Sequence, residues 1–154
     1  MKPEATTVEW EVQLHGLPID DNKGKEVVVQ WAMADFTSDN TFYTDSNGLE
    51  MQKRILNERP TFEVSTDEFA SSNYYPVNSA IAIRDTTAGM QLTVMNDRSQ
   101  GASVLEDGVI EILQNRRLLN DDGRGVDDAL NETNWSGEGI QVNARYFLQF
   151  FNYT

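Results

Sequence analysis

The feature that most constrains the fold of this 154-residue chain is a strict alternation of apolar and polar residues near its end. Every second position from Ile140 to Phe150 is apolar. Because successive side chains of a β-strand point to opposite faces of the sheet, this period of two predicts a strand with one buried face. Phe147 and Phe151 add aromatic surface to the opposite face. We therefore expect this strand to contact a neighbour from outside the chain.

The same period of two recurs along the rest of the chain, most clearly in residues 8–14 and 27–33. Further strands are predicted at residues 42–44, 62–64, 77–84, 90–95 and 109–113. Residues 49–56 contain good helix formers, but their apolar spacing is poor and Pro60 follows closely, so a strand or irregular structure is expected there. The turns are polar, and no segment is long enough for the helix of a parallel crossover.

These patterns predict an all-β fold, an antiparallel β-sandwich that is part of a larger super-sandwich-like domain. A chain of this length can bury one core, so residues 1–154 are expected to form a single β-sandwich domain or domain fragment.

Charge and composition exclude several functions. The chain has 12 basic and 25 acidic residues, a net charge of −13, which would repel nucleic acid and anionic membranes, so neither is expected as a partner. No apolar run approaches ~18 residues, and residues 1–7 have no apolar core, so neither a transmembrane helix nor a targeting signal is predicted. With no cysteine, thiolate catalysis and cysteine-ligated metal sites are excluded.

Few residues could carry chemistry. His15 is the only histidine and lies in a loop rich in glycine and proline, so we interpret it as an ordinary exposed loop residue that cannot form a multi-histidine metal site. Residues 45–48, Asp-Ser-Asn-Gly, lack the remaining ligands of a calcium loop and predict a hairpin turn instead. Paired acids occur at residues 20–21, 121–122 and 127–128. Adjacent residues of an extended chain point apart, so these pairs are interpreted as solvated turn acids.

The segment 116–125 is the densest in charge. Two glycines bracket Arg124, and Asp121 and Asp122 precede it. Such a loop can bend sharply and offer hydrogen bonds to a polar ligand. It can equally be a structural loop held by aspartate–arginine pairs, and both interpretations stay open at this point.

Three candidate N-glycosylation sites are present, at Asn131, Asn134 and Asn152. Their number is little above what the asparagine, serine and threonine contents give by chance, so they are weak support for secretion. Asn131 and Asn134 fall in the polar loop before the last strand, where a glycan could be accommodated.

Four segments in order carry a family resemblance: residues 42–48, 73–78, 92–101 and 116–125. Together they resemble the C-terminal β-domain of glycoside hydrolase family 38 α-mannosidases, most closely the lysosomal type. The resemblance implies part of a retaining, zinc-dependent exo-α-mannosidase that removes mannose from N-glycans, in the lysosome or secretory pathway.

The resemblance also implies where the chemistry lies. The family's zinc ligands and both catalytic aspartates belong to its N-terminal domain, which this chain lacks, so no catalytic residue, metal site or cofactor is expected here and the chain alone should be inactive. By match to the family's Asp-Asp-x-Arg-Gly motif, Arg124 is expected to be a substrate-side residue, with Asp121 and Asp122 as its supports. The expected partners are the N-terminal catalytic domain and mannose-containing glycans. The alternative is a stand-alone carbohydrate-binding or structural β-module without enzyme activity.

Overall fold

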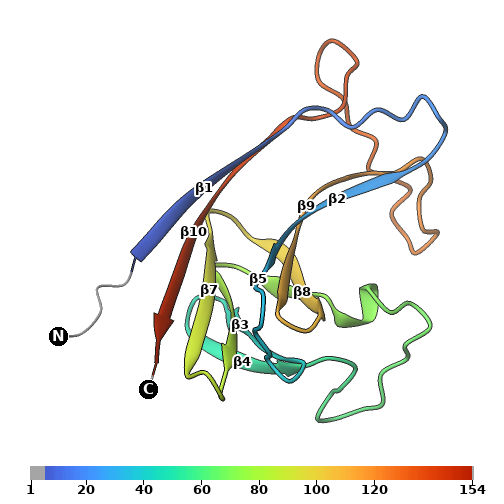
Figure 1. The fold of residues 1–154 in the computed structure, drawn as a ribbon. Coiled ribbons are helices and arrows are strands. Elements are labelled where there is room, and N and C mark those ends of the chain that lie inside the picture. Colours follow the sequence, from blue (N-terminus) through green and yellow to red (C-terminus); the bar gives the residue numbers. More distant parts are fainter. Residues whose placement is uncertain (1–5, 154) are drawn as a thin grey trace.

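The computed structural model describes residues 6–153. Most of the segment used for the targeting prediction, residues 1–5 of 1–7, lies outside this range, as does Thr154, the last residue of the third glycosylation motif. The described chain forms two antiparallel sheets stacked as a sandwich, which confirms the predicted all-β fold (Figure 1). The elements are β1 (Thr6–Leu14), β2 (Lys25–Ala32), β3 (Thr41–Ser46), β4 (Glu50–Ile55), the 3₁₀ turn η1 (Ser71–Asn73), β5 (Tyr75–Val77), β6 (Ala80–Asp85), β7 (Met90–Asn96), β8 (Gln100–Glu106), β9 (Val109–Arg117) and β10 (Val142–Asn152).

The larger sheet has the order β1-β10-β7-β6-β3-β4, and the smaller has the order β2-β9-β8-β5. The alternating segment became β10, which lies between β1 and β7 with Leu148 opposite both Val8 and Val94. Residues opposite one another in antiparallel strands share a face, so the apolar set of β10 points toward the smaller sheet. Phe147 and Phe151 lie half-buried on the outer face.

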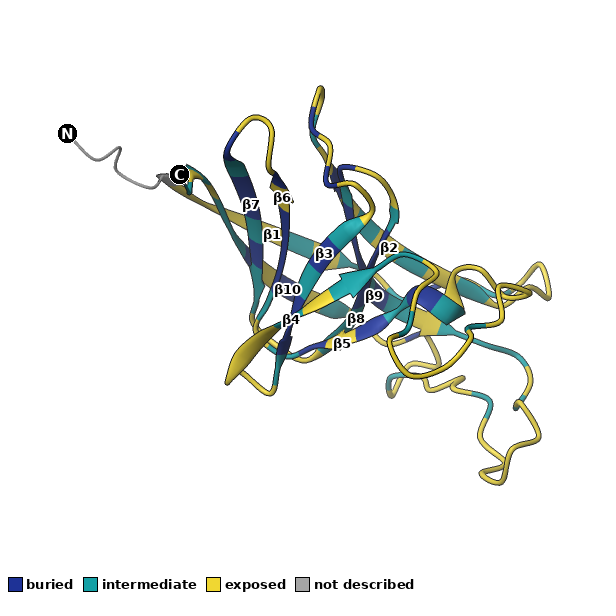
Figure 2. Ribbon diagram, turned by 90° about the horizontal axis from the view of Figure 1, so that it is seen from below, coloured by how far each residue is buried: buried dark blue, intermediate teal, exposed yellow. Residues whose placement is uncertain are grey.

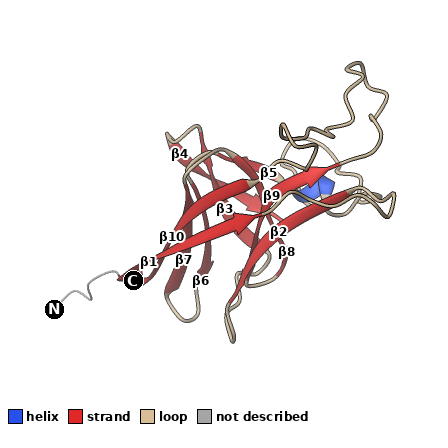
Figure 3. Ribbon diagram, turned by 90° about the horizontal axis from the view of Figure 1, so that it is seen from above, coloured by secondary structure: helices blue, strands red, loops and turns tan. Residues whose placement is uncertain are grey.

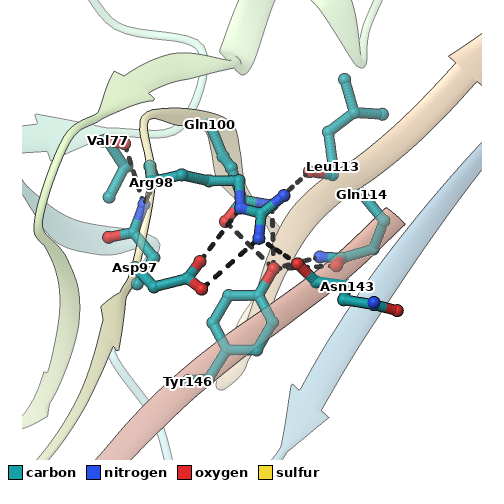
Figure 4. A network of polar contacts seen from close by, with 9 residues as sticks. Val77, Asp97, Arg98, Gln100, Leu113, Gln114, Asn143 and Tyr146 are labelled. Atoms are coloured by element: carbon teal, nitrogen blue, oxygen red, sulfur yellow. Dashed lines mark hydrogen bonds and ion pairs between the residues drawn. The ribbon is translucent and has the colours of Figure 1, made fainter. Parts of the chain in front are cut away.

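The core lies where the two sheets overlap, and Figure 2 shows the buried residues concentrated in the strands. Fully buried branched side chains such as Ile81 and Ile112 fill the space between the sheets. Trp31 packs edge-on against Tyr146, with ring centroids 4.9 Å apart. The Tyr146 hydroxyl lies between two glutamine amides, donating and accepting at 2.6 to 3.0 Å with Gln100 and Gln114 (Figure 4). This network satisfies polar groups that burial would otherwise leave unpaired.

One strand prediction was wrong, and another joined two separate strands. Residues 62–64 form no strand but belong to a long loop that includes η1. The loop covers the outer face of the smaller sheet, where the Ser103 hydroxyl donates to the Asn73 carbonyl at 2.8 Å. Residues 77–84 are not one strand, because the chain crosses from β5 in one sheet to β6 in the other.

A buried aspartate fixes this crossing. The Asp45 Oδ1 atom accepts the backbone N–H groups of Asn78, Ser79 and Ala80 at 2.8, 2.9 and 3.1 Å, and Oδ2 accepts that of Gly48 at 2.8 Å. Burial alone would raise the pKa of Asp45, but the four donors outweigh it and hold that pKa below its usual value. The crossing therefore depends on a charge supplied by β3.

The turn after Asp45 is the hairpin predicted from Asn47-Gly48. Both residues have positive φ, 52° and 71°, as the two central positions of a type I′ turn require, and the Leu49 N–H closes the turn by donating to the Ser46 carbonyl at 2.9 Å. The segment that follows, left open between strand and irregular structure, is β4. Seen from above, the long loops gather at the end of the sandwich remote from the start of β1 and the end of β10 (Figure 3).

Candidate functional site

Two long loops meet at this end, the segment after β1 (residues 15–24) and the segment after β9 (residues 118–141). They touch at Gly16 and Gly139, where a Cβ atom on Gly16 would stand only 2.2 Å from the Gly139 carbonyl oxygen. Arg117, at the end of β9, ties the loops together. Its Nη1 donates to the Leu17 carbonyl and its Nε to the Asn131 Oδ1 atom, both at 2.7 Å. The glycines permit the contact, and Arg117 stabilises it.

The junction encloses a hollow of about 370 Å³. His15, Asp20, Arg117 and Glu138 contribute polar groups to its lining, and the buried Leu17 contributes an apolar surface. Carboxylate, imidazole and guanidinium groups around a small concavity can hydrogen-bond a polyhydroxylated ligand. His15 is exposed, as predicted, and it lies at the hollow.

The loop that carries Arg124 is shaped by its two aspartates. Asp121 Oδ2 accepts the N–H of Gly123 at 2.7 Å, and Asp122 Oδ1 accepts the N–H of Arg124 at 2.9 Å. Gly123 and Gly125 both have positive φ, 69° and 119°, which explains glycine on each side of Arg124. The carboxylates thus hold the backbone N–H groups of Arg124 and of the residue before it.

The Arg124 side chain is exposed and, within residues 6–153, forms neither a hydrogen bond nor an ion pair. Arg124 does not line the 370 Å³ hollow, so the structure does not bring it together with His15 or Arg117. Its expected role on the substrate side stays a prediction. The geometry leaves all of its guanidinium donors available.

The three candidate glycosylation asparagines lie in different surroundings. Asn131 is exposed and accepts a hydrogen bond from Arg117. The Asn134 Oδ1 atom caps a turn by accepting the N–H groups of Ser136 and Glu138 at 2.9 and 3.0 Å. Asn152 is the exposed final residue of β10. Glycan occupancy stays a prediction at all three.

A second polar site lies on the outer face of the smaller sheet and was missed by the sequence reasoning. Glu111, only 8% exposed, accepts a hydrogen bond from Gln30 Nε2 at 2.6 Å and another from the Tyr74 hydroxyl. Burial, and then the Glu111 carboxylate, raise the pKa of Tyr74. The only signal was that Tyr74 lies in segment 73–78, one of the four segments that carry the family resemblance. Glu111 itself gave none, because a glutamate inside an apolar strand is normally interpreted as a solvent-facing residue.

Within the described range, no three histidine, cysteine, aspartate or glutamate residues lie close enough together to hold a metal ion. In the same residues, no helix is long and apolar enough to cross a membrane.

Residues 2–124 match the C-terminal domain of glycosyl hydrolases family 38, and the chain belongs to that family. Over 95% of its length it is 44% identical to lysosomal alpha-mannosidase from Bos taurus, and over 92% it is 44% identical to the Homo sapiens protein of that name. Over 95% it is 38% identical to a probable alpha-mannosidase from Arabidopsis thaliana. The chain spans only 13 to 14% of the length of these relatives.

Proposed function

We propose that this chain is a β-sandwich segment of a zinc-dependent, retaining α-mannosidase that hydrolyses terminal α-mannose from N-glycans. In this proposal the chain supports the catalytic domain and lines part of the substrate pocket, and the enzyme works in the lysosome, as the names of the relatives suggest. The observation that carries the pocket assignment is the Asp121–Gly125 loop, whose backbone is fixed while its arginine is free.

The chain's own residues suggest how the loop would act. Two carboxylate-to-backbone hydrogen bonds hold the loop's shape, so the Arg124 guanidinium is presented without the entropic cost of ordering the backbone on binding. Its planar fork can donate to two neighbouring sugar hydroxyls or to a carboxylate that contacts them. The role is orientation of substrate, not proton transfer, because an arginine does not deprotonate in proteins.

The residues of this chain do not match the zinc site that the family resemblance implies. His15 is the chain's single histidine and does not fit the two-histidine zinc site that the family resemblance implies. Zinc and both catalytic carboxylates therefore belong to the preceding catalytic domain in this proposal, where the metal would supply Lewis-acid chemistry.

The test is Arg124→Ala in the full-length enzyme, assayed on an aryl α-mannoside. We expect kcat/KM to fall ~10- to 1000-fold, equivalent to ~1.4 to 4 kcal/mol, through loss of a charged positioning contact. The matched control is Arg145→Ala, which removes an arginine whose only ion pair among residues 6–153 is exposed and 3.7 Å long. A normal kcat/KM with a lowered melting temperature in Arg124→Ala would refute the pocket assignment.

The second candidate is a stand-alone carbohydrate-binding module, and the polar hollow beside Arg117 favours it. Saturable binding of mannose-containing glycans by the 154-residue chain, lost in Arg117→Ala, would support this function.

A further inference from the structure

The sandwich is open along one side. An apolar groove of about 410 Å³ runs over β1, β10 and β7 and is lined by Val8, Trp10, Met33, Leu92, Leu148 and Phe150. Val8 and Trp10 are each 49% exposed, and Phe150 is 40% exposed. Three large apolar side chains exposed together are unusual for a surface that faces only water.

The groove belongs to the inner face of the larger sheet. Val8 lies opposite Leu148, and Trp10 lies opposite Tyr146, which is fully buried in the core. The exposed residues therefore continue the face that forms the core, at the point where the smaller sheet stops covering it. Figure 1 shows the free ends of β1 and β10 extending beyond β2 and β9.

β1 also has a free backbone edge. Among the described residues it pairs only with β10 and stands last in its sheet. Such an edge offers unpaired N–H and C=O groups to another strand. The opposite face of β1 carries Glu9 and Glu11, both exposed, so the strand presents an apolar row on one side and an acidic row on the other.

The charges argue against a second copy of this chain as the occupant. Antiparallel self-pairing centred on Trp10 would set Glu9 of each copy opposite Glu11 of the other. Like charges directly opposite each other destabilise a strand pair. A strand with basic residues on its outer face would instead complement these carboxylates.

On the other side of the sandwich, where β4 and β5 are the edge strands, the chain covers the gap between the two sheets with its own residues. There Arg54 and Arg59 both stack on the ring of Tyr75, at 4.4 and 4.5 Å from its centroid. Arg59 also donates to the carbonyls of Glu58 and Ser72, fastening the loop that covers this side. No comparable closure occurs at β1 within residues 6–153.

We propose that an extended segment from elsewhere in the longer polypeptide adds to β1 as a further strand, with apolar side chains toward the groove and lysine or arginine side chains beside Glu9 and Glu11. The proposal rests on the proposed function, because it takes the chain to be about one-seventh of a larger enzyme, as it is of its relatives. It specifies the chemistry of the partner as alternating apolar and basic residues.

The test uses the 154-residue chain carrying Trp135→Phe, which removes a tryptophan that is 99% exposed and leaves Trp10 as the main exposed one. The probe is a nine-residue peptide that alternates lysine with isoleucine, matching the nine residues of β1. We expect saturable binding with a shift of tryptophan emission to shorter wavelength, weakening as salt is added. A peptide of the same composition with its lysines and isoleucines in separate blocks should bind at least ~10-fold more weakly.

Charge reversal isolates the acidic row. Glu9→Lys with Glu11→Lys should weaken binding of the lysine peptide ~10-fold or more and favour a peptide that alternates glutamate with isoleucine. The matched control, Glu50→Lys with Glu63→Lys, changes the net charge equally at exposed positions away from β1 and should leave binding unchanged. We expect both double variants to fold, because the only ion pair that the charge reversal removes among the described residues, Glu9–Arg145, is exposed and 3.7 Å long. Melting curves of both variants verify this.

Three results would overturn the proposal. The first is that the alternating and block peptides bind equally well. The second is that a backbone N-methylated peptide, which cannot pair as a strand, binds as well as the unmethylated one. The third is that the free chain forms a stable dimer that the peptide does not dissociate. Each leaves the Arg124 test in the full-length enzyme unaffected, so failure here is distinguishable from failure of the proposed function.

Discussion

The turn after β3 and the loop after β9 are both shaped by aspartates that accept backbone N–H groups, but the number of donors differs. Asp45 is 4% exposed and accepts four, whereas Asp121 and Asp122 each accept one. The buried Asp45 carboxylate joins segments that are 35 residues apart, whereas those of Asp121 and Asp122 each bridge only two residues. Hydrogen bonds from backbone N–H groups to an aspartate therefore stabilise the fold in one region, and in the other they fix the loop that presents the Arg124 side chain.

The largest expected effect comes from removing the buried acceptor. Asp45→Ala leaves four backbone donors without their partner, and we expect a loss of ~3 to 5 kcal/mol of unfolding free energy in urea titrations. Asp45→Asn keeps one acceptor oxygen and should lose less than the alanine variant. Equal stability of Asp45→Ala and the unsubstituted chain would remove the basis of the comparison.

Lowering the pH is expected to have an intermediate effect on the free energy of unfolding. Asp107 is desolvated, which raises its pKa, yet hydrogen bonds from Ser38, Thr37 and Asn40 lower the pKa from 3.8 to about 2. A carboxyl with a depressed folded-state pKa stabilises the fold above its unfolded value and loses that contribution as the pH falls. Stability should therefore decline between pH ~4 and ~2 when urea midpoints are measured across this range.

The Asp107→Asn variant sharpens this measurement. It should be less stable at neutral pH and show a shallower decline below pH ~4. An unchanged pH profile would mean that other groups, Asp45 among them, account for the acid sensitivity.

The smallest effect on stability is expected at the exposed loop. Asp121→Ala and Asp122→Ala each remove one solvent-exposed hydrogen bond, so the free energy of unfolding should change by less than ~1 kcal/mol. In the full-length enzyme both should lower kcat/KM, because the Arg124 backbone loses its brace. A large loss of stability with unchanged turnover would place this loop with the Asp45 turn instead.

Local patterns predicted what depends on neighbours in sequence. Alternation located β10 and the inward direction of its apolar residues, and Asn47-Gly48 located a hairpin. The division of residues 77–84 between two sheets was not predictable, because a carboxylate from β3 causes it. The contact of Gly16 with Gly139 escaped prediction for the same reason, since loops far apart in sequence create it.

The pairing of β1 with β10 has a consequence for synthesis of the protein. Thr7 and its hydrogen-bonding partner Gln149 are 142 residues apart, so β1 leaves the ribosome long before its partner exists. At ~5 to 20 residues per second, that interval is on the order of ten seconds. During this time β1 lacks β10, its partner strand within residues 6–153, and non-local pairs of this kind form slowly. Among the described strands, β1 is thus made first and is among the last to pair, and its apolar row depends on protection from aggregation until residue 152 has emerged.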